Sequence, residues 1–517
     1  MKKTVLSICL LVSAASFAQQ RVAVGYRICT DRAEQTILHF GASDGWSMRY
    51  IGLWSERLQR QLAQWLFSSQ NDAHGQPLGI GLSLWRFNLG AGSAEQGDSS
   101  QISPNTRTEC FLNADGTYDW TRQRGQRNFL HEAQRMGVKS FLAFMNSVPV
   151  MYTANGLATN TGRDATMNIQ PDKFKDVAKF TARVMKGLED SDSIHFDYIS
   201  PVNEPDGSWN WLGPKQEGSP ATNREVSRLV KAMSREFKKN KISTRITIDE
   251  SSDIRCLLGI HSTDWQRGYG IRDFFGKDST QTYLGNVSSV LPAVLAHSYW
   301  TDTPVDSMKA VRLRLRDELS RRNLGYWESE LCIMSNDNEI GGGGYFDFSM
   351  RTALYVARVM HYDLVYGNAQ SWSWWRAVGG DYKDGLLRAF SEDNLKTGFV
   401  VPSRLMWAMG NYSRFIRPGA VRYDVEALDA SGNILPDGET QPYSVMVSAY
   451  KNRDGSWVVV AINYSEGFRN FALQAPLQDS WEMYRTSDVE GETLKPVGIM
   501  NGTTRLQPKS ITTFVLK

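Results

Sequence analysis

Two short stretches of this chain carry acidic side chains at the end of an apolar run, where a buried strand would release them. Residues 195–205 read HFDYISPVNEP and contain Glu204; residues 324–331 read LGYWESEL and contain Glu328 and Glu330. Two carboxyl groups held close together can act on one bond, because one can stay protonated while its neighbour is ionised. The stretches therefore predict combined acid–base and nucleophilic chemistry, provided that the fold brings them together.

Other polar and aromatic side chains stand at the ends of similar runs or in the loops that follow. An arginine there can pair with a carboxylate, a tyrosine can donate a hydrogen bond to it, and an indole can stack on the CH face of a sugar. Any single one is more commonly a structural ion pair or a core residue, so the prediction rests on the set. The candidate substrate-binding residues are Asp44, Trp46, Arg86, Asn146, Asn203, Trp209, His297, Tyr299, Trp300 and Trp374.

Eight apolar runs alternate with longer stretches that carry apolar residues at three- and four-residue spacing. The runs expected to be strands cover residues 39–45, 81–90, 139–147, 195–205, 244–251, 293–300, 324–331 and 371–378. The expected helices cover 50–68, 122–137, 172–189, 222–239, 305–322, 348–367 and 402–415, with a weaker pattern at 263–275. Strand–helix alternation demands parallel strands, so the fold class is α/β and the architecture a closed (β/α)8 TIM barrel.

A doubly wound open sheet is the competing architecture. It normally carries a glycine-rich phosphate turn between an early strand and its helix. Here the early glycine-containing stretch, GASDG at residues 41–45, is followed by Trp46 instead of a helix start. The barrel is therefore preferred, with residues 39–415 as its extent.

The pattern changes after about residue 416. Residues 443–465 alternate β-branched and polar residues around an NRDGS turn, and the chain ends in SITTFVLK. These are strand and hairpin signals, so residues 416–517 are expected to form a smaller all-β sandwich at the side of the barrel. Residues 19–38 also contain a strand pattern, which could join that sandwich from the other end of the chain.

Composition and the first residues bound the possible partners. Lys2 and Lys3 precede an apolar run that ends in Ser16-Phe17-Ala18, so residues 1–18 predict a signal peptide and an exported protein, periplasmic or extracellular. No later run is long enough to span a membrane. The formal charge is only +3, without a basic tract, which argues against nucleic acid. We expect a monomer without a cofactor.

The cysteines and histidines give little sign of a metal. Cys29, Cys110, Cys256 and Cys332 are widely scattered, with no CxxC motif, and the seven histidines show no paired spacing. No metal site is therefore predicted, and the four thiols are either buried or joined in one or two disulfides.

In such a barrel the reactive groups stand at the C-terminal ends of the strands, and the fourth and seventh strands face each other. A retaining glycosidase needs two carboxyl groups about 5 to 5.5 Å apart. We therefore expect Glu204 to be the acid/base. A period of two places Glu328 and Glu330 on one face, and Glu330, nearer the strand end, is the preferred nucleophile. Asn203 would hold a hydroxyl next to the reacting carbon.

Several motifs, in this order, resemble glycoside hydrolase family 30, in particular its endo-β-1,6-galactanase branch: GASDGWS, RFNLGAGSAEQGDSS, PVNEP, HSYW and WESE. The resemblance runs from about residue 39 to the end. It implies a barrel with a β-sandwich and retention by two glutamates, which fall by motif on Glu204 and Glu330. It also implies that Arg86, Asn203, His297, Tyr299 and Trp374 surround the sugar at the reacting position.

Several alternatives stay open at this point. The substrate is a β-linked polysaccharide or oligosaccharide, and a β-xylanase, β-glucanase or exo-β-glycosidase would show the same acids. A carbohydrate-binding protein without chemistry would keep the tryptophans but would commonly lose one acid. A metal-dependent hydrolase would need paired histidines.

Overall fold

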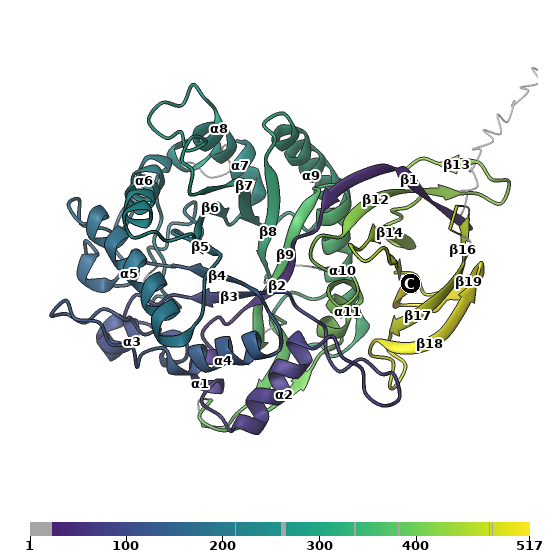
Figure 1. The fold of residues 1–517 in the computed structure, drawn as a ribbon, viewed down its shortest axis with the longest axis horizontal. Coiled ribbons are helices and arrows are strands. Elements are labelled where there is room, and N and C mark those ends of the chain that lie inside the picture. The colour runs from purple at the N-terminus through teal and green to yellow at the C-terminus, as the bar shows by residue number, and fades with distance from the viewer. Residues whose placement is uncertain are drawn as a thin grey trace, which may run out of the picture.

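The computed structural model describes residues 23–517 except 212, 260–264, 335–337, 381–382, 394, 475 and 478. The predicted signal peptide, residues 1–18, lies outside the described residues. The described chain forms a large body of strands and helices beside a smaller body of strands (Figure 1).

Eight parallel strands make the centre of the larger body. They pair in chain order, and the last also pairs with the first, which closes the barrel. The strands are β2 (His39–Ser43), β3 (Leu84–Asn88), β4 (Ser140–Phe144), β5 (Tyr198–Ser200), β6 (Arg245–Ser251), β7 (Val290–His297), β8 (Gly325–Leu331) and β9 (Ala369–Gly379). The predicted TIM barrel is confirmed, and each strand falls within or overlaps a predicted run.

Helices cover the outside of the barrel because each presents one apolar stripe. The longer ones are α2 (Glu56–Phe67), α4 (Arg124–Arg135), α5 (Phe174–Asp192), α6 (Asn223–Lys239), α9 (Val305–Ser320), α10 (Met350–Val365) and α11 (Arg404–Ser413). Helix α6 begins with a capping box, in which the Thr222 hydroxyl accepts from the Glu225 amide and the Glu225 carboxylate accepts in return. The shorter helix α8 (Gly270–Phe275) falls within the weakly patterned stretch 263–275, whereas α7 (Ile254–Leu258) precedes it and was not predicted.

Large side chains fill the barrel interior below the site. The Trp327 ring contacts Tyr198 and His39 edge-on, with ring centroids 4.9 and 5.6 Å away. These residues come from β8, β5 and β2, so their side chains must meet inside the barrel. Trp327 therefore marks the inward face of β8.

Two further strands extend the sheet beyond β9. Strand β10 (Gly385–Phe390) pairs with β9 in parallel, and β11 (Phe399–Pro402) pairs with β10 in antiparallel. Neither strand was predicted, because the apolar run is interrupted by a polar loop.

The smaller body is one continuous, mostly antiparallel sheet that returns to its starting strand. Strand β1 (Gly25–Thr36) pairs with β12 on one side and, in parallel, with β16 on the other. The remaining strands are β12 (Val421–Leu428), β13 (Ile434–Leu435), β14 (Val445–Lys451), β15 (Trp457–Asn463), β16 (Arg469–Gln474), β17 (Ser480–Thr486), β18 (Lys495–Asn501), β19 (Thr503–Leu506) and β20 (Ser510–Leu516). A strand from before the barrel thus completes the module that follows it.

The two bodies share a buried interface. Met446, Ile462 and Ile511 of the smaller sheet belong to the same apolar cluster as the barrel core, whereas a second cluster fills the inside of the sheet itself. Asn411 of α11 donates to the Thr513 hydroxyl at 2.9 Å, and that hydroxyl donates back to the Asn411 carbonyl at 2.7 Å. Helices α10 and α11 therefore bridge both cores (Figure 1).

The four cysteines that the structure describes are free and buried. Among the described residues, no helix is long and apolar enough to cross a membrane.

Candidate active site

Glu204 stands just past β5 in a turn that holds its backbone. Its φ of 48° lies in the left-handed region, its amide donates to the Glu250 carbonyl at 2.9 Å, and its carbonyl accepts from the Trp209 indole at 2.9 Å. A non-glycine residue at positive φ persists only where its surroundings fix it. The NEP turn therefore sets the direction of the Glu204 side chain.

Glu330 lies near the end of β8, across the barrel from β5. Its carboxylate forms an ion pair with Arg86 and accepts from the Tyr299 hydroxyl at 3.0 Å. The Glu330 side chain is only 5% exposed. Burial raises the pKa of Tyr299 well above its usual range, and the adjacent Cys332 and Glu330 add to this effect, so the phenol keeps its proton and serves as a donor.

The structure brings Glu204 and Glu330 together with His297. One carboxylate oxygen of each glutamate and one ring nitrogen of His297 all lie within 4.8 Å of one another. That spacing leaves no room for a water molecule between the carboxyl groups and a sugar, and it matches the short separation of retaining glycosidases, about 5 to 5.5 Å.

A buried network of charges supports the pair. Arg86 donates to Asn203 Oδ1 and to Glu250 Oε2, each at 2.8 Å, and Glu250 Oε2 also contacts His297 Nε2 at 3.0 Å. His297 Nδ1 lies 3.0 Å from Glu204 Oε1. Glu250, at the end of β6, was not among the predicted site residues, although it ends a predicted strand as they do. Its contacts with Arg86 and His297 place it in the centre of the network.

The surroundings push the pKa values of these groups apart. Burial and, to a smaller extent, the charge of Glu330 raise the pKa of Glu204 to about 7, although the hydrogen bond from His297 lowers it. Burial would raise the pKa of Glu250 as well, but Arg86 and His297 outweigh it and hold that pKa below its usual value. One carboxyl group can therefore carry a proton near neutral pH while its neighbour is ionised.

His297 takes the positive charge that this arrangement requires. Burial alone would lower the pKa of the imidazole, but the charge of Glu330 and the hydrogen bonds to the flanking glutamates raise it well above its ordinary value. The imidazolium and the Arg86 guanidinium together balance the charges of Glu250 and Glu330.

A bulge in β8 corrects one prediction of strand geometry. On the β7 side, the neighbours Ala296 and His297 pair with Glu328 and Glu330, which are two residues apart in β8. On the β9 side, the register shifts between Glu328 and Leu331. Glu328 therefore does not share the face of Glu330: it pairs laterally with Ala296 and Trp372, and its Oε1 accepts from the Ser298 amide at 3.3 Å. The simple period of two failed because of the bulge.

A second bulge, in β9, corrects the choice of tryptophan. The register shifts between the pairs Ala42–Trp374 and Ser43–Arg376, so Trp375 is the extra residue. Trp374 stacks on Trp372 and donates to the Asp384 carbonyl at 2.5 Å, away from the carboxyl pair. Trp375 instead lies 5.8 Å from the Arg86 guanidinium. The indole beside the site is Trp375, not Trp374.

Trp46 reaches the same wall of the site. Its ring meets that of Trp375 edge-on at 5.3 Å, and the Arg376 guanidinium lies 5.2 Å above it. The indole nitrogen is buried and has no hydrogen-bond partner in the described part of the chain. A sugar hydroxyl is a suitable acceptor for it.

Asp44 is held by the protein itself. It is 1% exposed, and its oxygens accept from the Asn88 amide at 2.9 Å and from Gln126 at 2.8 Å. Burial raises its pKa to about 7, against those two hydrogen bonds. These contacts tie Asp44 to the end of β3; that it also contacts the substrate stays a prediction.

Two buried amides, by contrast, lack partners. Asn88 on β3 and Asn146 after β4 are 0% and 2% exposed, and no side-chain amide atom of either is hydrogen-bonded within the described residues. Asn88 lies two residues beyond Arg86 on the same face of its strand. Buried amides normally find partners, so four unpaired polar atoms at the ends of β3 and β4 indicate a place for a hydroxyl-rich ligand. The sequence analysis named Asn146 but not Asn88.

The remaining predicted aromatics divide by exposure. Trp209 is 4% exposed and serves the Glu204 turn, whereas Trp300 is 51% exposed beside Tyr299. Trp211 is 45% exposed and lies 5.3 Å from Trp209, ring to ring. The open indole faces are therefore those of Trp211 and Trp300, in the loops after β5 and β7.

The cluster of Glu204, His297 and Glu330 also has a spacing that could hold a metal ion. Arg86 already pairs with Glu330, and the raised pKa of His297 favours a protonated ring, which cannot ligate. Both groups disfavour a bound cation. That no metal takes part stays a prediction.

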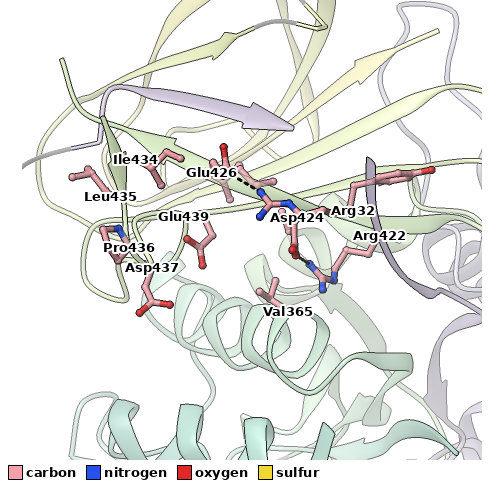
Figure 2. A pocket seen from close by; sticks show the side chains of 14 residues that line it. Arg32, Val365, Arg422, Asp424, Glu426, Ile434, Leu435, Pro436, Asp437 and Glu439 are labelled. Carbon is pink, nitrogen blue, oxygen red and sulfur yellow. Dashed lines mark hydrogen bonds and ion pairs between the residues drawn. The ribbon is translucent and has the colours of Figure 1, made fainter. Parts of the chain in front are cut away.

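A separate pocket of about 240 Å³ lies between the smaller sheet and the end of α10 (Figure 2). Its arginines pair with its own acids: Arg32 with Glu426 at 2.6 Å and Arg422 with Asp424 at 3.2 Å.

A closed barrel with two carboxyl groups within 4.8 Å of each other at the ends of facing strands defines a barrel glycoside hydrolase. The sequence model of O-Glycosyl hydrolase family 30 matches residues 23–388, and the chain belongs to that family.

Relatives and solved structures agree with this assignment. The chain is 31% identical over 199 residues to Glucuronoxylanase XynC of Bacillus subtilis, a match that covers 37% of this chain and only 39% of the relative. A conserved exported protein from Bacteroides fragilis superposes with a TM-score of 0.88 at 32% identity, over 95% of this chain and all of the other. The catalytic domain of GH30 xylanase C from Talaromyces cellulolyticus shares the fold, with a TM-score of 0.65 at 21% identity and coverage of 95% and 100%.

Proposed function

We propose that the protein is an exported, monomeric, retaining β-glycoside hydrolase in which Glu204 is the acid/base and Glu330 the nucleophile. The observation that carries the proposal is the approach of the two carboxyl groups to within 4.8 Å, in surroundings that raise the pKa of Glu204 to about 7. Export is supported by the signal-peptide pattern and by the likeness to the exported Bacteroides fragilis protein.

In the first step the Glu330 carboxylate attacks the anomeric carbon while Glu204 gives its proton to the leaving oxygen. Arg86 and Tyr299 hold Glu330 by the ion pair and the 3.0 Å hydrogen bond, which fixes the line of attack. The sugar becomes covalently bound to Glu330, and the leaving group departs as an alcohol.

In the second step water replaces the leaving group. Once Glu330 is esterified its negative charge is gone, so the charge that raised the pKa of Glu204 is removed and that pKa falls. Glu204 then takes a proton from water, which attacks the same carbon and releases Glu330. Two inversions retain the configuration at the anomeric carbon.

For the substrate we propose a plant-type β-linked polysaccharide, and β-1,6-galactan cleaved internally as the first candidate. The exposed indoles of Trp211 and Trp300 support internal cleavage, because they offer stacking faces beyond a single sugar pocket. A glucuronoxylanase is among the relatives, and a structural neighbour at 16% identity with a TM-score of 0.64 is an endo-β-1,6-glucanase. Xylan, β-1,6-glucan and exo action are therefore the alternatives to test beside galactan.

The first experiment is a panel of β-linked polysaccharides, read by the size of the products and by the anomeric configuration in NMR. Glu330→Gln should lower turnover of the substrate so found by about 10⁴-fold or more, because it removes the nucleophile. Glu318→Gln is the matched control and should match the wild type, because the half-buried Glu318 pairs with Arg321 and Arg322 at the end of α9, outside the site.

Near-normal turnover by Glu330→Gln, or products of inverted configuration, would contradict the assignment of roles. Binding of a glycan by the wild type without any turnover would instead identify a carbohydrate-binding protein.

A further inference from the structure

A second buried network lies on the outer face of the barrel, directly behind the carboxyl pair. Asp363 of α10 accepts from Arg312 Nε at 2.7 Å, from the Trp372 indole at 3.0 Å and from the Ser298 hydroxyl at 3.1 Å. Helix α10 lies outside the barrel beside β9 (Figure 1), and the Trp372 and Ser298 side chains contact its Asp363, so these two side chains point outward. Every one of these residues is fully buried.

Glu328 belongs to this outer network. It is 0% exposed, pairs laterally with Trp372 on β9 and Ala296 on β7, and accepts from the Ser298 amide at 3.3 Å. Ser298 directly follows His297, whose ring contacts the acid/base on the inner face. One strand thus carries Glu328 outward and Glu330 inward, two residues apart.

The bulge in β8 makes this possible. Trp327 points into the barrel and Glu328 out of it; a regular strand would then point Ser329 in and Glu330 out. The register shifts on both sides of β8 show that the extra residue is accommodated between Glu328 and Leu331. A slip of one residue would turn the Glu330 carboxylate away from the anomeric carbon.

The charges of the outer network balance only if one acid is neutral. Arg312 is its cation, and Asp363 and Glu328 are its two carboxyl groups; the charge of His297 also acts on Glu328 and partly offsets the effect of Asp363. Burial raises the pKa of Glu328 well above its usual value, and the charge of Asp363 raises it further. These surroundings favour the neutral form of the Glu328 carboxyl group.

We propose that the buried Glu328 is a positioning residue that fixes the bulge of β8 and so aims Glu330 at the substrate. The inference rests on the proposed role of Glu330 as nucleophile. The two glutamates of the WESE motif then have different roles on opposite faces of β8: Glu330 reacts with the sugar, and Glu328 fixes the backbone from the outer face.

The test compares Glu328→Ala with Glu328→Gln. The alanine variant should lower kcat by about 10- to 100-fold with KM within about 2-fold, because a misplaced nucleophile slows the chemical step and leaves binding alone. The glutamine variant keeps a neutral side chain of the same shape and should stay within about 3-fold of the wild type. Melting temperatures are measured for both, and kinetics are run well below them.

Trapping of the nucleophile separates positioning from simple stability. A 2-deoxy-2-fluoro glycosyl fluoride of the sugar accepted in the panel should label Glu330 in the wild type, as read by peptide mass spectrometry. Its trapping rate should fall with kcat in Glu328→Ala. Should that variant not fold, Trp372→Phe replaces it, since it removes the indole donor to Asp363 and keeps an aromatic side chain. Its trapping rate should fall by about 3-fold or more.

Each outcome decides one question. A wild type that is labelled elsewhere than at Glu330 would overturn the proposed nucleophile. If the wild type is labelled at Glu330 but Glu328→Ala keeps the wild-type kcat and trapping rate, the positioning role of Glu328 alone is overturned. The same result in Trp372→Phe, where that variant is used, has the same meaning. A Glu328→Gln variant as slow as Glu328→Ala would show that the charge of Glu328 matters, and would overturn its neutral role.

Discussion

At the scale of single residues, the site depends on which of three neighbouring glutamates carries a proton. Glu204, Glu250 and Glu330 lie in one network, yet Arg86 contacts the last two and not Glu204. The protein thereby distinguishes otherwise identical side chains. The acid that must carry the proton is the one without a guanidinium partner.

The pH dependence of the reaction should report this difference. The pKa of Glu204 is raised to about 7, so its protonated form is lost as pH rises through 7, and kcat/KM should fall with a midpoint near that value. Glu204→Gln should remove this alkaline limb on an aryl glycoside, whose leaving group needs no proton. An alkaline limb that persists in Glu204→Gln would assign it to another group.

Asn88 offers a second test at this scale. Its amide has no partner within the described residues, so Asn88→Ala should leave the melting temperature unchanged and lower kcat/KM by about 10-fold or more through lost sugar contacts. Asn160 is the matched control, because its amide donates to the Asp164 carbonyl at 2.6 Å; Asn160→Ala should lower the melting temperature instead. A drop in stability with unchanged kinetics in Asn88→Ala would exclude substrate contact.

At the scale of elements, strand irregularities decide which side chains reach the cleft. The bulge in β8 separates Glu330 from Glu328, and the bulge in β9 exchanges Trp375 for Trp374. Bulges concentrate next to active sites because they redirect a side chain without rebuilding the sheet.

The roles of Trp374 and Trp375 in β9 can be distinguished by mutation. Trp375→Ala should lower kcat/KM by about 10-fold or more, since the indole lies against Arg86 in the wall of the site. Trp374→Phe should lower the melting temperature by removing the hydrogen bond to the Asp384 carbonyl, with kcat/KM within about 2-fold of the wild type. The reverse pattern would place Trp374 in the cleft.

The sequence predicted the elements well and their irregularities poorly. Apolar runs and helical spacing located all eight barrel strands, and the position of Glu204 and Glu330 at strand ends was enough to select them. A bulge leaves no such signal, because it depends on pairing with both neighbouring strands. The partners of Asp44 and the place of Glu250 depend likewise on contacts between strands far apart in the chain, which no local pattern encodes.

At the scale of the whole molecule, the smaller sheet is bonded to the barrel through polar groups as well as apolar ones. Asn411→Ala should lower the free energy of unfolding by about 1 to 3 kcal/mol, because it leaves the buried Thr513 hydroxyl without its donor. Urea unfolding measures this change, with Asn470→Ala on exposed β16 as a control that should stay near the wild type. Equal stability of both variants would show that the Asn411–Thr513 hydrogen bond does not stabilise the interface between the two bodies.

Strand β1 has a consequence for the order in which the protein can assemble. Gly25 pairs with Leu428 and Tyr26 with Leu473, so the earliest described strand meets its neighbours only after the entire barrel has been synthesised. During translation, β1 cannot form its hydrogen bonds with β12 and β16 until the hundreds of residues between them have been synthesised. The smaller module is therefore the last to close, and its closure ties the beginning of the chain to its end.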